Sequence, residues 1–129
     1  IETVRGSDFV LLVTEPTPFG LHDLKLAVAA LEELELPYGV VVNRADASGD
    51  GTTAWCRQNG VRVIAELPED RQVAEAYSRG DLAVSSVPDY AAQIEAILAV
   101  LLDETGRACS GKRARRPVAH AAACRTRRG

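Results

Sequence analysis

The sequence predicts an α/β fold built on a parallel, doubly wound sheet of three strands with flanking helices. Two observations lead to this prediction. Three short runs of mostly apolar residues are typical of strands that are covered on both faces. Between and after these runs, apolar residues recur at three- and four-residue spacing, which is typical of helices. Because strands that alternate with helices join through right-handed crossovers, we expect the strands to lie parallel.

The three apolar runs are the expected strands. The first covers residues 8–13 (DFVLLV), the second 38–42 (YGVVV) and the third 61–65 (VRVIA), where Arg62 is the one polar interruption. Runs of this length are typical of buried strands, since helices extend over more residues.

Four helices are expected around these strands, each marked by a residue that starts or stops a helix. Proline and glycine end helices, and aspartate is a favoured N-cap. The expected helices are 21–34 before Pro37, 53–58 before Asn59 and Gly60, 71–79 before Gly80, and 89–102 with Asp89 as N-cap.

The composition indicates one soluble domain. The chain has 129 residues, of which 47% are hydrophobic and 26% charged, and it has no apolar run long enough to span a bilayer. Its three cysteines, Cys56, Cys109 and Cys124, have neither even pairing nor C-x-x-C spacing, so we expect a cytoplasmic protein without disulfides.

His22 lacks a serine or cysteine partner, and we expect no catalytic residue in this chain. We expect Cys56 to be buried, and Trp55, Tyr77 and Tyr90 to be packing residues.

Charge divides the chain into two parts. Residues 1–104 carry all 18 acidic residues and 7 of the Lys and Arg, whereas residues 105–129 carry 8 basic residues and no acid. The second part has almost no large apolar residues, so we expect a basic, disordered tail over residues 105–129 after a folded domain over 1–104. The tail is either a solvated extension or an electrostatic arm for anionic partners. Because no aromatic residue interrupts it to stack bases, we expect no nucleic-acid partner.

Polar residues follow each expected strand. Thr14 and Glu15 follow the first, Asn43, Arg44 and Asp46 the second, and Pro68, Glu69 and Asp70 the third. Because the carboxyl ends of parallel strands meet at one edge of a sheet, we expect these residues to form a ligand site there. The alternative is that these loops are polar only because they are exposed, with Pro68 and Asp70 starting the next helix.

The loop after the second strand fits a purine. The Asn43 amide offers a donor and an acceptor side by side, which matches the edge of adenine, whereas the Asp46 carboxylate would accept from the paired donors of guanine. The Arg44 guanidinium can stack on a base or pair with phosphate. The stretch 46–51 also resembles the start of a calcium loop, but Arg57 stands where that loop needs a bidentate glutamate, and we expect no metal site.

Three phrases resemble one known family. They are SDFVLLVTEPTPFGLHDLKLAV (7–28), GVVVNRAD (39–46) and IAELPEDRQVAEAYSRGDL (64–82). Together they are similar to the C-terminal half of the MinD/Mrp (MinD/ParA-like, SIMIBI class) deviant P-loop ATPases, in the branch with an inserted 4Fe-4S ferredoxin domain. The resemblance covers about residues 1–100. It implies that Asn43 contacts adenine and that the loop of Pro68, Glu69 and Asp70 closes over the base.

The resemblance also assigns a role to the first loop and to the missing parts. Residues 14–18 (Thr14, Glu15, Pro16, Thr17 and Pro18) would lie near the switch region that senses the nucleotide and helps to form a homodimer. ATP with Mg²⁺ and the 4Fe-4S clusters would be held mainly upstream, because no G-x-x-x-x-G-K-[ST] loop is present here. The start of the chain reads as the end of a helix before Gly6, so we expect a fragment.

The expected function is the adenine-nucleotide-binding half of a cytoplasmic ATPase linked to iron–sulfur or redox-partner chemistry. The fragment alone is expected to be inactive, because phosphoryl transfer depends on the lysine, magnesium and backbone amides of the phosphate loop. The alternatives are a guanine-nucleotide-binding homologue, if Asp46 reads the base, and a non-catalytic, flavodoxin-like protein-interaction module.

Overall fold

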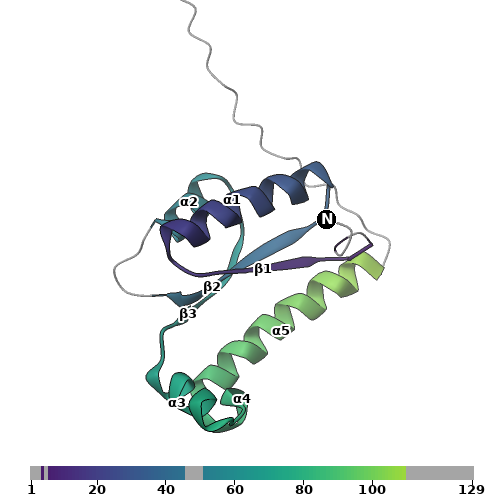
Figure 1. The fold of residues 1–129 in the computed structure, drawn as a ribbon. Coiled ribbons are helices and arrows are strands. Elements are labelled where there is room, and N and C mark those ends of the chain that lie inside the picture. The colour runs from purple at the N-terminus through teal and green to yellow at the C-terminus, as the bar shows by residue number, and fades with distance from the viewer. Residues whose placement is uncertain (1–3, 5, 46–50, 110–129) are drawn as a thin grey trace, which may run out of the picture.

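The computed structural model describes residue 4 and residues 6–45 and 51–109, with side chains up to residue 106 (Figure 1). Strands and helices alternate through the first half of the chain, and helices alone complete the second half. In chain order the elements are β1 (Val10–Thr14), α1 (Pro18–Glu33), β2 (Tyr38–Ala45), α2 (Thr52–Gln58), β3 (Val63–Pro68), α3 (Arg71–Arg79), α4 (Ala83–Ser86) and α5 (Pro88–Cys109).

The three strands form a parallel sheet in the order β1-β2-β3. Helices α1 and α2 cover one face and α5 runs diagonally across the other, while α3 and α4 lie beyond the carboxyl ends of the strands (Figure 1). The alternation of β2 side chains explains the two cores. Val40 and Val42 pack with Leu24 and Val28 of α1 and Cys56 of α2, whereas Val41 packs with Leu67 and with Ile97 of α5. The predicted α/β class with a parallel sheet is confirmed.

The main differences from the sequence prediction lie at the ends of elements. The second strand continues through Asn43, Arg44 and Ala45, and the third begins at Val63 and continues to Pro68. Strand ends are set by pairing between β2 and β3, and this pairing continues past the valines to Asn43 and Ala45, with a register shift at Arg44 between them. Apolar runs alone therefore placed the ends of these strands too early.

The last helices also differ from the prediction. The short helix α4 was not expected, and the N-cap prediction for Asp89 is wrong because α5 begins one residue earlier, with Pro88 in its first turn. Helix α5 continues to Cys109, five residues past the boundary drawn from charge. The remainder of the basic segment, residues 110–129, lies outside the described residues, and so do residues 1–3 of the expected N-terminal helix end.

The expected packing of the aromatic residues is confirmed in two of three cases. Trp55 packs against the α1 side of the sheet, where the Lys25 ammonium lies 5.6 Å from its ring centre, and Tyr90 packs against the α5 side. Cys56 is buried, as expected. Tyr77 is 65% exposed on α3, so its expected packing role is wrong. Over the residues that the structure describes, no helix has the length and apolar character needed to cross a membrane.

A bulge in β3 explains a glycine in β2. The register between β2 and β3 shifts between Val40 and Val41, which leaves Ile64 as the extra residue on β3. A Cβ at Gly39 would lie 2.5 Å from Ile64 Cδ1 and 3.2 Å from Phe9 Cζ. The absence of a side chain at residue 39 therefore makes room for Ile64 on the α5 face.

Three helices end in the same hydrogen-bonded turn. Gly80 directly follows α3, and Gly60 follows Asn59 at the end of α2. Both glycines have positive φ, and in each turn the amides of the glycine and of the next residue donate to carbonyl groups of the last helical turn. Helix α1 ends in the same way, with Glu35 N–H donating to Glu32 O and Leu36 N–H to Leu31 O. Glu35 has a φ of 54° in a position that favours glycine. The end of α1 is therefore strained where the other two are not.

Replacing Glu35 by glycine should stabilise the chain. Glu35→Gly removes the Cβ from a left-handed residue without removing any hydrogen bond of the turn, and we expect the free energy of unfolding to rise by about 0.5–1 kcal/mol. Urea titration of the two proteins measures the difference. Gly80→Ala is the matched reverse substitution and should be destabilising; a loss of stability in Glu35→Gly would contradict the prediction.

Candidate site at the carboxyl edge of the sheet

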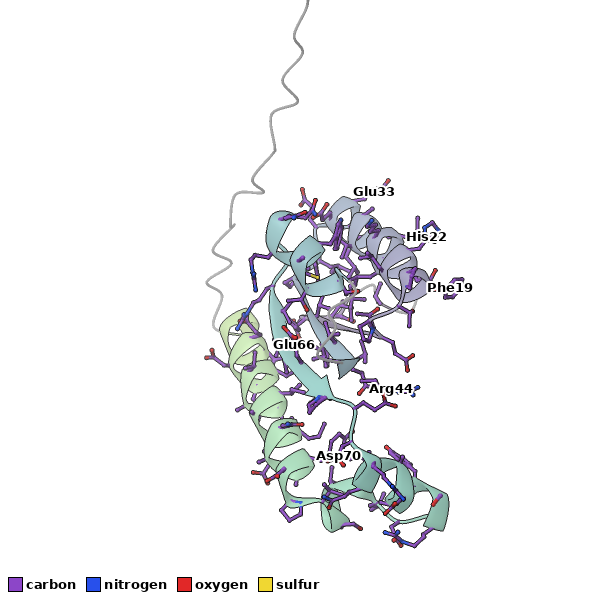
Figure 2. All side chains as sticks on the ribbon, turned by 90° about the vertical axis from the view of Figure 1, so that its left-hand side faces the viewer. Phe19, His22, Glu33, Arg44, Glu66 and Asp70 are labelled. Carbon is purple, nitrogen blue, oxygen red and sulfur yellow. The ribbon has the colours of Figure 1, made fainter. Side chains whose placement is uncertain are left out.

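The carboxyl ends of the three strands bring the predicted loops to one edge of the sheet. Thr14 is the last residue of β1 and Pro68 the last residue of β3. Asn43 and Arg44 lie just before Ala45, the last residue of β2. Figure 2 shows Arg44 projecting from this edge, on the side where the chain leaves β3 for Asp70 and α3. The site residues predicted from the three loops are therefore neighbours in space wherever the structure describes them.

Arg44 joins the two outer loops. Its Nη2 lies 2.9 Å from Glu69 Oε1, and its Nη1 lies 3.6 Å from Glu15 Oε1. The hydrogen bond and charge of Glu69, together with the charge of Glu15, raise the pKa of the Arg44 guanidinium above its usual range. All three side chains are about half exposed. Arg44 thus bonds to two other predicted site residues, and this arrangement was not foreseen from the sequence.

The backbone at Arg44 is unusual. Its φ is 56°, in the left-handed region that side chains other than glycine rarely adopt. The pairing of β2 with β3 shifts at the same point, because Asn43 lies opposite Leu67 while Ala45 lies opposite Pro68. The amide of Glu69 donates to Ala45 O at 3.2 Å, which fixes the third loop to the end of β2. A bulge of this kind redirects side chains at the end of a strand.

Asn43 is half buried beside this bulge. It lies opposite Leu67 in the ladder, and its side chain makes no hydrogen bond to any residue that the structure describes. Within the described part of the chain, both the donor and the acceptor of its amide are therefore without a partner. This is the group that the sequence predicted as the contact to the base.

The first loop is fixed to the start of α1. Thr14 is nearly buried, and its hydroxyl donates to Gly20 O at 3.2 Å. Thr17 is the N-cap of α1, with its Oγ1 accepting from Gly20 N–H at 2.9 Å, and Pro18 follows as the first helical residue. The loop of residues 14–18 is thus held by its own capping bonds as well as by Arg44.

Two predicted site residues need separate comment. Asp70 is the N-cap of α3, with its Oδ1 accepting from Gln72 N–H at 2.7 Å, so the capping role weighed for it from the sequence is confirmed. Asp46 lies outside the described residues, and its predicted contact to guanine stays a prediction. His22 and Asp23 lie in the exposed first turns of α1. Within the described ranges, no group of three or more His, Cys, Asp or Glu residues could hold a metal ion.

A shallow groove of about 300 Å³ lies beside the site, between β1 and α1. This groove was not predicted from the sequence. The glycine in TPFG was the available signal, because Gly20 allows the close approach to Thr14 that shapes the groove. Val13 and Phe19 at the groove are 62% and 75% exposed. The residues that line it are Leu12, Val13, Thr14, Glu15, Thr17, Phe19, Gly20, Asp23, Leu24 and Ala27.

Comparison with known proteins gives one similarity. The chain is 32% identical to an uncharacterized protein, MJ0579, of Methanocaldococcus jannaschii over 81 residues, which make up 63% of this chain and 27% of that protein. The chain therefore spans about a quarter of the length of the curated relative that it matches. No family model matches the chain. No solved structure matches it significantly.

Proposed function

We propose that the chain is the adenine-nucleotide-binding half of a MinD-like P-loop ATPase that is linked to iron–sulfur or redox-partner chemistry. The observation that supports this most is the position of Asn43. Its amide lies at the carboxyl edge of a parallel sheet, where nucleotides bind in folds of this class, and it makes no hydrogen bond to a described residue. The resemblance of GVVVNRAD to the family's base-contacting segment agrees with this position.

In this proposal each loop of the edge has its own part. Asn43 offers its acceptor to the exocyclic amine of adenine and its donor to the neighbouring ring nitrogen. The third loop, from Pro68 to Asp70, covers the base from the neighbouring strand, and Asp70 contributes by capping α3. The first loop, residues 14–18, faces the phosphate side and the partner copy of a homodimer.

The phosphate-binding half belongs to the rest of the longer protein. Bound ATP with Mg²⁺ would supply the phosphate bond that is hydrolysed. The residues of this chain would bind and orient the base. The open edge of β1, with Val13 exposed beside an apolar groove, fits a sheet that continues into that half. The 4Fe-4S clusters, the redox partner and the cytoplasmic location are inferred from the resemblance, as is the homodimer.

Substituting Asn43 in the full-length protein tests the proposal. Asn43→Ala should weaken ATP binding by about 1–3 kcal/mol, the range for losing a paired base contact. Displacement of a fluorescent ATP analogue by ATP and by GTP measures the effect. Asn59→Ala is the matched control, because Asn59 lies at the exposed end of α2 and bonds only locally to Trp55 O. Asp46→Ala separates the bases: under the adenine proposal it should leave ATP affinity nearly unchanged, whereas under the guanine alternative it should abolish a preference for GTP.

The result also decides between the proposal and the interaction module. The exposed Phe19 and Val13 beside the first loop favour the module as the second candidate, since exposed apolar side chains at a loop edge are typical of protein contacts. If Asn43→Ala folds normally and binds both nucleotides as tightly as the parent, the edge is not a base site and the module becomes the better account.

A further inference from the structure

Arg44 combines a bulge in the strand with two ion pairs. Its backbone is left-handed, the register of β2 on β3 shifts beside it, and its guanidinium contacts carboxylates from both flanking loops. A strained backbone persists only where the surrounding structure holds it, and such residues gather at functional sites. Glu35, the other described non-glycine residue with positive φ, lies at a helix end instead and follows the common pattern there.

Arg44 is the described basic residue that pairs with two carboxylates at once. Arg62, just before β3, also pairs over a long sequence distance, with Glu104 of α5, but it joins only that one carboxylate among the ion pairs of the described residues. Arg71 pairs with Glu75 within α3, and Arg79 pairs with Asp81 just after that helix. Both of those pairs are local in sequence. Arg44 instead joins Glu15, which follows β1, to Glu69, which follows β3, across the end of the strand between them. One side chain thus ties the ends of all three strands together.

We propose that Arg44 is a positioning residue that holds the first and third loops at a fixed spacing on either side of Asn43. This inference deepens the proposed function and rests on it for the identity of the ligand. The planar guanidinium presents two separate N–H groups in a fork, so it serves two carboxylates at once. A lysine ammonium is a single point of charge at the end of a flexible chain and cannot fix both spacings.

The arrangement also links the two loops. Glu69 is bonded to Arg44 through its side chain and to Ala45 through its amide, so the third loop moves with the end of β2. Glu15 contacts the same guanidinium at a longer distance, so the first loop follows the same residue less tightly. Binding of a base against the third loop would therefore also change the mobility of the first loop, which carries the N-cap of α1.

Hydrogen exchange of the chain without nucleotide tests the positioning. The reporters are the amide of Glu69, bonded to Ala45 O, and the amide of Thr17, bonded to Glu15 O at 2.8 Å. Arg44→Gln keeps a polar side chain without the charged fork, and it should raise exchange at both amides about fivefold or more while the amides of Val40–Val42 stay protected. Arg71→Gln, which breaks a local pair on α3, is the matched control and should leave both reporters unchanged.

Two further variants separate positioning from general stability. Glu69→Gln should loosen the amide of Glu69, and the double variant with Arg44→Gln should add little at that amide to either single change, because both remove the contact between Arg44 and Glu69. Arg44→Lys should restore protection at Glu69 and not at Thr17. Unchanged exchange at both amides in Arg44→Gln would overturn the proposal, whatever the outcome at Asn43.

Nucleotide binding by the full-length protein tests what the positioning serves. Arg44→Gln should weaken displacement of a fluorescent ATP analogue about three- to tenfold, and Arg44→Lys should recover part of that loss. Loosened amides with unchanged ATP affinity, in a protein where Asn43→Ala does weaken binding, would overturn the claim that Arg44 positions the loops for the base. If Asn43→Ala has no effect either, the base site fails while the exchange result still decides the role of Arg44.

Discussion

Leu24→Ala is expected to lower the free energy of unfolding by about 2–3 kcal/mol, the lower part of the range for buried leucines. Leu24 is 4% exposed and packs on Val40 and Val42 in the core between α1 and the sheet. Truncation removes buried methyl groups and leaves a space that the stiff valines of β2 cannot fill. The loss stays in the lower part of the range because Leu24 also lines the groove beside β1, where water can enter the space.

The same helix provides the control for this substitution. Leu26 is two residues away and 60% exposed, so Leu26→Ala should change the stability by no more than about 0.5 kcal/mol. Urea titration of both variants and the parent gives the comparison directly. Similar losses for the two leucines would mean that α1 packs on the sheet through a different face from the one described here.

Gly20→Ala is expected to cost about 1–3 kcal/mol, although alanine is the better helix former. Gly20 lies in the first turn of α1, and a Cβ there would lie 2.5 Å from the backbone oxygen of Glu15 and 3.1 Å from the hydroxyls of Thr14 and Thr17. A backbone oxygen cannot rotate away as a side chain can. The loop of residues 14–18 would therefore have to shift, and its capping bond from Gly20 N–H to Thr17 would be strained.

Gly106 is the matched control for Gly20. It also lies in a helix, near the end of α5, but no atom lies within 4 Å of the position that its Cβ would take. Gly106→Ala should therefore raise the stability, by up to about 1 kcal/mol, through helix propensity alone. Thermal and urea unfolding of the two variants should move in opposite directions. A gain of stability in Gly20→Ala would contradict the close approach of β1 and α1.

Much of the fold was predictable because its signals are local. The apolar runs of residues 8–13 and 38–42 and the periodic leucines of 21–34 each indicate their own element, and glycines marked two helix ends correctly. The ends of β2 and β3 were not predictable in this way. They depend on a ladder between distant segments that includes two register shifts, and no local pattern reports a register.

The sequence predicted which residues lie at the candidate site, but not which of them form ion pairs with one another. The position of Asn43 at the end of the second strand follows from the length of the apolar run before it. The pairing of Arg44 with Glu69 does not follow from the sequence, because it joins residues 25 positions apart. It also requires a left-handed backbone at Arg44, which an arginine does not indicate. From the sequence, Arg44 was considered as a group that stacks on a base or binds phosphate, whereas the fold pairs it with two carboxylates.

The contact between Gly39 and Ile64 constrains how this sequence can change over time. The two residues share one volume on the α5 face, since the side chain of Ile64 occupies the space that a Cβ at residue 39 would need. A larger residue at position 39 requires the Ile64 side chain to move away or to be replaced by a smaller one, so the order of the two substitutions affects the stability of the intermediate. Related proteins that carry alanine at the first position should therefore carry a shorter side chain than isoleucine at the second, and the two columns should vary together.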